Sequence, residues 1–197
     1  MQIGYKTKIN LTESQSAKLI QWVGCARFVW NQKIEENEYF YAFGSKFVPV
    51  TQWRWLNKQE PIHNDLINKQ FSYFKDNEMS PWLSECPSQI LRNSVTEWFD
   101  TQKKFMKGDC GRPRKKRRED GGSVWLTNEL FEIRCVRKNT ATIFIGTKRN
   151  NIGEVLIPVR RGLPTKPNSL RIKIDSYGKW YVSFSYDDQP GIVTDVK

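Results

Sequence analysis

The segment Gly111–Arg118 reads GRPRKKRR and places six cationic side chains in eight positions. Lys and Arg contact phosphates without regard to base sequence, and each contact releases counterions that were condensed on the polyanion. A solvated charge run or a localisation-type patch is the alternative interpretation. The segment therefore predicts contact with a nucleic-acid backbone, made by Arg112, Arg114, Lys115, Lys116, Arg117 and Arg118.

The charge of the chain is unevenly distributed. Residues 1–100 contain 11 Lys and Arg and 11 Asp and Glu, whereas residues 101–197 contain 21 and 10. The whole net charge of +11 therefore belongs to the second half. A field concentrated in this way attracts a polyanion, so nucleic acid is the expected partner.

Composition excludes several other classes of protein. Aromatic residues make up 13% of the chain, which argues against a disordered basic tail. No apolar run approaches the roughly 20 residues of a membrane span, and the first residues lack an apolar signal core. The four cysteines form no C-x-x-C pair and there is one histidine. We therefore expect a reduced, cytoplasmic and nucleoid-associated protein without a metal or cofactor and without a membrane partner.

Two elements are predicted near the start of the chain. Apolar and polar residues alternate over residues 2–11, as in a half-buried strand. Thr12 and Gln15 then fit a capping box at the start of a helix. That helix is predicted from Glu13 to Phe40, because apolar residues recur at spacings of three and four: Leu19, Val23, Ala26, Trp30 and Ile34. A further helix is expected within residues 50–60.

A helix is also predicted between Pro87, which suits a first turn, and Gly108, which suits a helix end. Its expected inner stripe is Leu91, Val95, Trp98, Gln102 and Phe105. Beside this stripe, four polar side chains project from the first two turns: Ser88, Gln89, Arg92 and Asn93.

After the basic segment the pattern changes to a period of two, which predicts strands at 130–137, 141–146, 153–159, 169–175 and 179–187. Asp175–Gly178 is a good hairpin turn between the last two. The first strand needs partners, and only the later strands can supply them. The predicted fold is therefore α+β, a β-barrel interrupted by a helical insertion after its first strand.

Four collinear segments resemble the TnpB family of transposon-encoded RNA-guided nucleases, which are related to compact type V CRISPR effectors. They begin with YKTKINLTESQSAKLIQWVGCARFVWNQKI and WLSECPSQILRNSVTEWFDTQKKFMKG. GRPRKKRRED with SVWLTNELFEI follows, and then LIPVRRGLP with SLRIKIDSYGKWYVSFSYD. Lys115 stands where the family has an aromatic residue.

The resemblance implies an oligonucleotide-binding-like wedge barrel with an inserted helical, helix-turn-helix-like recognition lobe. It divides the chain into a first strand (1–12), a helical lobe (13–108), a basic linker loop (109–128), the rest of the barrel (129–189) and a tail (190–197). In the family a RuvC-like nuclease domain follows the barrel. Its Gly-x-Asp-x-Gly pattern is not found around Asp195, so we expect this chain not to cleave nucleic acid.

The resemblance also implies roles for individual residues. Arg160, Arg161 and Lys173 would hold guide RNA on the barrel, together with Lys166, Arg171 and Lys179. The polar side chains Ser88, Gln89, Arg92 and Asn93, with Thr127, would read a short duplex motif, since Arg suits guanine and Gln suits adenine in the major groove. An ordinary solvent-facing helix surface is the alternative. Trp125 and Tyr181 are candidates for stacking on bases.

These patterns predict a binding module of a TnpB-like, transposition-associated protein. It would bind a structured guide RNA, double-stranded DNA or both, without cleavage. The main alternative is one half of a split RNA-guided DNA endonuclease, completed in trans by a separate RuvC-bearing polypeptide. A decayed gene product and a helix-turn-helix repressor are further alternatives, of which the second does not explain the later strands.

Overall fold

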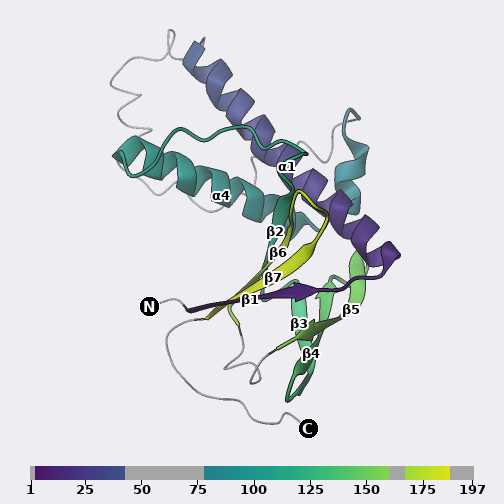
Figure 1. Ribbon diagram of the computed structural model, residues 1–197. Helices are drawn as coiled ribbons and strands as arrows, with labels where there is room; N and C mark the ends of the chain where they lie inside the picture. Colours follow the sequence, from purple (N-terminus) through teal and green to yellow (C-terminus); the bar gives the residue numbers. More distant parts are fainter. Residues whose placement is uncertain (1–2, 43–77, 160–166, 187–197) are drawn as a thin grey trace.

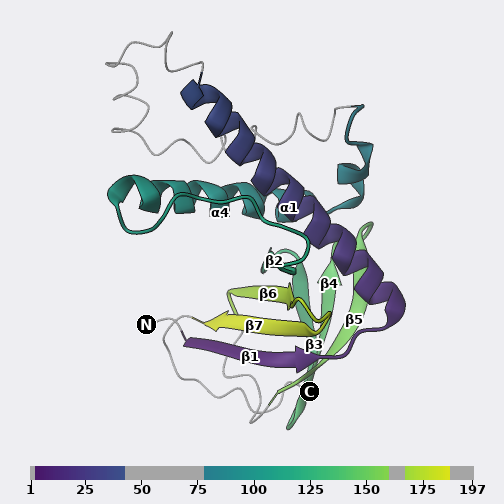
Figure 2. The ribbon, with the colours of Figure 1, turned by 45° about the horizontal axis from the view of Figure 1, so that its top comes forward.

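A computed structural model describes residues 3–42, 78–159 and 167–186 of the chain. The helix expected within 50–60, the tail 190–197 and three of the expected RNA contacts (Arg160, Arg161 and Lys166) lie outside these ranges. The described residues form helices on one side of two antiparallel sheets (Figure 1, Figure 2). The α+β class expected from the sequence is confirmed.

The first sheet contains four antiparallel strands in the spatial order β1 (Ile3–Ile9), β7 (Trp180–Tyr186), β6 (Ser169–Ile174) and β2 (Gly122–Thr127). The first strand therefore pairs with the last, with Ile3 opposite Tyr186 and Ile9 opposite Trp180. The prediction that the isolated first strand finds its partner among the later strands is correct.

The second sheet contains β3 (Phe131–Arg137), β4 (Thr140–Gly146) and β5 (Asn151–Pro158), joined as consecutive hairpins. β1 lies beside β5, at the junction of the two sheets. Among the described residues no hydrogen-bonded ladder joins the sheets, so the strands form two open sheets and not the closed barrel expected from the sequence.

The helices are α1 (Glu13–Ala42), the short 3-10 helix η2 (Pro81–Glu85) and α4 (Ser88–Lys107). α1 begins with the predicted capping box, in which the Thr12 amide donates to Gln15 Oε1 at 3.1 Å and the Gln15 amide donates to Thr12 Oγ1 at 3.3 Å. α4 ends at Gly108, whose φ of 83° lies in the left-handed region that favours glycine. No helix in the described ranges is both long and apolar enough to cross a membrane.

The helices pack on each other and on the first sheet. The five residues of the predicted α1 stripe are all buried, at 7% exposure or less. In α4, Leu91 and Val95 are buried as predicted, but Phe105 is 37% exposed. Ser94 is buried instead, because its hydroxyl donates to the carbonyl oxygen of Ala26 at 2.6 Å and joins the two helices.

Residues 109–128 were expected to form a basic linker loop, but Gly122–Thr127 form strand β2. Val124 and Leu126 point into the core and the strand pairs along its full length with β6. With only two inward apolar residues, its alternation is too short to distinguish it from a loop. Gly122 lies against α1: a Cβ there would stand 2.4 Å from Val23 Cγ1.

Candidate nucleic-acid interface

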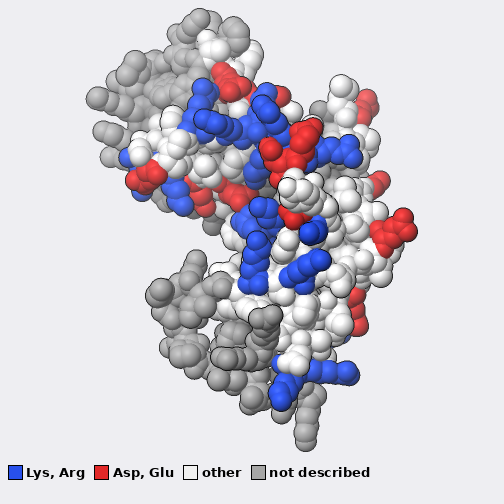
Figure 3. All heavy atoms as spheres, viewed as in Figure 1, with Lys and Arg blue, Asp and Glu red and all other residues white. Residues whose placement is uncertain are grey.

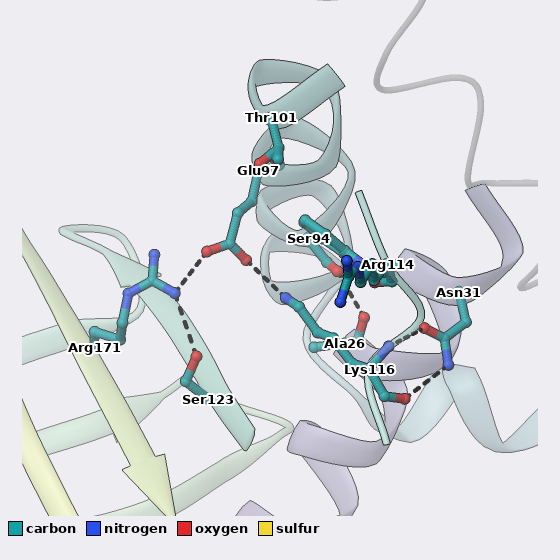
Figure 4. Close-up of polar contacts among 10 residues, drawn as sticks. Ala26, Asn31, Ser94, Glu97, Thr101, Arg114, Lys116, Ser123 and Arg171 are labelled. Carbon is teal, nitrogen blue, oxygen red and sulfur yellow. Dashed lines mark hydrogen bonds and ion pairs between the residues drawn. The ribbon is translucent and has the colours of Figure 1, made fainter. Parts of the chain in front are cut away.

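The basic segment, Gly111–Arg118, is neither helix nor strand, yet its backbone is held on α1. The indole nitrogen of Trp30 donates to the carbonyl oxygen of Arg114 at 3.0 Å. The Asn31 side chain donates to the carbonyl oxygen of Lys116 at 3.1 Å and accepts from its amide at 2.9 Å. Asn31 thus bonds both polar groups of one residue (Figure 4), which fixes the path of the segment without using its charges.

Half of the cations in the basic segment have carboxylate partners on the helices. Arg112 lies 3.7 Å from Glu38 on α1, and Lys115 lies 2.9 Å from Glu35 on the same helix. Lys116 lies 3.2 Å from Glu97 on α4.

The other three cations are Arg114, Arg117 and Arg118. All are exposed, and none has a carboxylate oxygen within 4.0 Å among the residues that the structure describes. Their guanidinium groups are therefore the charges of this segment that remain available to a phosphate.

Glu97 joins three parts of the molecule. Its Oε2 accepts from Lys116 Nζ in the basic segment, and its Oε1 accepts from Arg171 Nη1 on β6 at 2.8 Å. Arg171 also donates to Ser123 Oγ on β2 at 3.3 Å (Figure 4). Lys116 Nζ stands 3.7 Å from the ring centroid of Trp30, so its charge meets a carboxylate and an aromatic face together.

The protonation of this cluster follows from its surroundings. Burial alone would raise the pKa of Glu97, but the charges and hydrogen bonds of Lys116 and Arg171 outweigh it and lower that pKa. For Lys116, burial is the largest effect and the charge of Arg171 adds to it, so its pKa is lowered despite the charge of Glu97. Glu97 therefore keeps its negative charge and acts as the counterion of both Lys116 and Arg171.

The start of α4 carries the residues expected to read a duplex. Ser88 is exposed, whereas Gln89 and Arg92 are half-buried. Asn93 differs from the expectation: it is 5% exposed, and its amide donates to the carbonyl oxygen of Trp125 on β2 at 2.8 Å. Asn93 therefore holds α4 against the sheet and is not available on an outer face.

Thr127 lies at the end of β2, two residues beyond the Asn93 contact. Within the described ranges, Thr127 Oγ1 and Arg92 Nε are buried without a hydrogen-bond partner. Lys173 is exposed on β6. The predicted site residues thus occupy three places: the basic segment, the start of α4 with the end of β2, and the first sheet.

Asn31 and Glu97, which organise the basic segment, were not among the residues predicted from the sequence. Asn31 and Lys116 are 85 positions apart in the chain, and Glu97 is 19 positions from Lys116 and 74 from Arg171. The acidic residues that follow Asn31 in EENE were a visible signal, because a carboxylate cluster on a helix can receive a distant cationic segment.

Residues 1–46 match the helix-turn-helix domain of the IS605 OrfB family. The matched region contains β1 and α1, so it includes the helix that holds the basic segment. Over its described part, residues 3–42, the matched region contains one helix, α1, and α4 packs on that helix. The match indicates a DNA-binding, transposase-associated function. No curated protein matches the chain.

Proposed function

We propose that this chain is a nucleic-acid-binding part of a TnpB-like, transposition-associated protein. It binds a structured guide RNA and the short duplex motif beside a DNA target, and its own contribution is binding and not cleavage. The observation that carries the proposal is the basic segment, whose backbone is fixed by Trp30 and Asn31 while three arginines remain exposed.

A fixed cationic segment suits phosphate contact for a physical reason. A flexible loop loses conformational entropy when it binds, whereas a segment already bonded to α1 loses less. Arg114, Arg117 and Arg118 would act as sequence-independent anchors on the backbone of the nucleic acid. The match of residues 1–46 to a helix-turn-helix domain of a transposon-encoded family supports the same role.

Duplex readout is assigned to the start of α4 and the end of β2. Ser88 and Gln89 lie on the first turn of α4, and Arg92 follows one turn later. Ser88 is exposed and the side chains of Gln89 and Arg92 are partly open to solvent, which suits contact with base edges. Asn93 does not contribute to duplex readout, because it is buried and bonded to the carbonyl oxygen of Trp125. The two sheets would form the wall of an open, oligonucleotide-binding-like barrel that carries the guide RNA, with Lys173 among its contacts.

Fluorescence anisotropy tests the proposal with two labelled probes, a short DNA duplex and an RNA hairpin, in a sodium chloride series. We expect the logarithm of the affinity for the duplex to fall linearly with the logarithm of the salt concentration, by about 0.9 per phosphate contact. Incubation with Mg²⁺ should leave both probes intact. Absence of salt-dependent binding to both probes would contradict the proposed function, and a cleaved probe would contradict the assignment of binding alone.

A further inference from the structure

The outer face of the first sheet has a composition unlike that of its inner face. The strand registers place Tyr181 between Lys8 and Lys173, and Lys173 is in turn opposite Ser123. These residues form a row across the sheet, one from each of the four strands, and the next row on the same face is built in the same way. We call these two rows the sheet face: Lys8, Tyr181, Lys173 and Ser123 in the first, and Lys6, Ser183, Arg171 and Trp125 in the second.

Alternation fixes which side chains belong to the sheet face. The intervening residues of the same strands are buried in the core, among them Ile9, Val182 and Ile172. A slip of one residue in β1 or in β6 would turn two cations of that strand towards the core, so the register is strongly determined. The sheet face contains no acidic residue in either row.

Three of the four cations of the sheet face are open to solvent. Lys6, Lys8 and Lys173 are exposed, and none has a carboxylate within 4.0 Å in the part of the chain that the structure describes. Arg171 is bound by Glu97. Figure 3 shows Lys and Arg side chains continuing from the helices over the strands, with acidic side chains gathered mainly at the helices.

Both aromatic residues of the sheet face have a cation beside the ring. Lys6 Nζ lies 4.6 Å from the ring centroid of Tyr181, and the guanidinium carbon of Arg171 lies 6.0 Å from that of Trp125. A base that stacks on Tyr181 replaces the flexible Lys6 side chain, whose ammonium group is then free to meet the adjoining phosphate.

The spacing of the two rings selects the form of the nucleic acid. Tyr181 and Trp125 lie two strands apart and in neighbouring rows, so strand spacing and rise place their Cα atoms roughly 12 Å apart. Neighbouring bases in a duplex are only about 3.4 Å apart along each strand, and their faces are covered by one another. Only an extended strand with unstacked bases matches two separated platforms.

We propose that the sheet face binds an unpaired stretch of nucleic acid, with one base stacked on Tyr181 and another on Trp125. Lys6, Lys8 and Lys173 contact its phosphates. This inference rests on the proposed function, because it assigns to one surface of the nucleic-acid-binding chain the single-stranded form of the ligand. In this proposal the basic segment binds paired nucleic acid, and the sheet face binds unpaired nucleic acid.

The test uses the full chain and three labelled probes: oligouridylate, oligothymidylate and a DNA duplex. We expect Tyr181→Leu and Trp125→Leu each to weaken binding of the single strands by about 5- to 100-fold, because leucine keeps apolar bulk and lacks an aromatic face. Tyr181→Phe and Trp125→Phe should keep most of the affinity. Tyr177→Leu is the matched control, since Tyr177 is 85% exposed in the β6–β7 turn and outside the sheet face.

The outcomes separate this inference from the proposed function. If the leucine variants bind single strands as tightly as the phenylalanine variants, the stacking proposal is wrong, while salt-dependent duplex binding still supports the proposed function. If the leucine variants lose duplex and single-strand affinity equally, the two residues have a structural role and the inference is also wrong. If the wild-type chain binds none of the probes, both proposals fail. A preference between oligouridylate and oligothymidylate identifies RNA or DNA as the unpaired ligand.

Discussion

The basic segment and the sheet face differ in how much of their charge is available. The basic segment has six cations in eight positions, but carboxylates on α1 and α4 pair with three of them. The sheet face has four cations on two strands, β1 and β6, and only Arg171 has a carboxylate partner among the described residues. The region that dominates the sequence is therefore no richer in unpaired charge than the region that the sequence hides.

This difference teaches that charge density along a chain and charge available to a ligand are separate properties. Paired cations such as Lys115 already have an anion at hydrogen-bonding distance, so a phosphate gains less by approaching them. An unpaired cation beside an aromatic ring, such as Lys6, retains both its charge and a platform for a base.

The largest effect is expected from removal of the unpaired arginines. The triple variant Arg114→Ala, Arg117→Ala and Arg118→Ala should reduce the salt slope of duplex binding by about 0.9 for each lost contact, and weaken binding at moderate salt by about 100-fold or more. Its stability should change little, because these side chains are exposed. Anisotropy titrations across a salt series measure the slope.

A charge-balanced variant is the control for that experiment. Removal of two complete ion pairs leaves the net charge unchanged and should leave the salt slope unchanged, because paired cations contribute few phosphate contacts. The variant combines Arg112→Ala, Glu38→Ala, Lys115→Ala and Glu35→Ala. If the salt slope of duplex binding decreased equally in the triple arginine variant and in this charge-balanced variant, the distinction between paired and unpaired cations would be wrong.

The next effect is expected at Glu97. Glu97→Gln leaves Lys116 and Arg171 close together without a counterion, which should lower the free energy of unfolding by about 1–2 kcal/mol. The same change frees two cations and should strengthen nucleic-acid binding. Urea unfolding and anisotropy measure the two quantities. Glu132→Gln, which breaks an exposed pair with Arg134 on β3, should change neither.

Asn31→Ala should release the backbone of the basic segment. Two hydrogen bonds to Lys116 are lost, at a cost of about 1–2 kcal/mol of stability, and trypsin should then cleave the segment faster. Gln32→Ala is the control, because its side-chain amide bonds Glu35 on the same helix. Equal cleavage rates in the two variants would show that Asn31 does not hold the segment.

The smallest effect is a pH dependence of the Glu97 contribution. Its pKa is lowered in the folded chain, so the unfolded chain binds the proton more readily. The stability difference between the wild type and Glu97→Gln should be full above the ordinary pKa of 4.5 and decline as the pH falls through the lowered folded pKa. Urea unfolding of both proteins at a series of acidic pH values measures this stability difference. If the difference did not change with pH, the lowered pKa of Glu97 would be contradicted.

Local features could be predicted from the sequence because their causes are local. The capping box at Thr12 and Gln15 is an example. In the hairpin turn the amides of Tyr177 and Lys179 donate to the Asp175 carboxylate, and Gly178 takes the positive φ. Within such elements, neighbouring residues supply every necessary partner.

The features that could not be predicted depend on distant partners. Asn93 was expected on an outer face by helical periodicity, but β2 lies over that position and accepts its hydrogen bond. To predict the sheet face one must know the register of four strands, and three of them are separated from β1 by long stretches of chain. Periodicity shows which side of a strand is polar, whereas only pairing shows which polar side chains are neighbours.

The pairing of β1 with β7 also affects how the chain folds during synthesis. Ile3 and Tyr186 stand at opposite ends of the sequence, so this ladder has a very high contact order. A ribosome adds about 5–20 residues per second, so β1 waits on the order of ten seconds or more before its partner strand emerges. During that interval Ile9, which ends buried against Trp180 and its neighbours, has no sheet to cover it. The long helix that follows β1 can form as soon as it is synthesised, because its hydrogen bonds are local. The first sheet, in contrast, is completed only when β7, the last strand, pairs with β1.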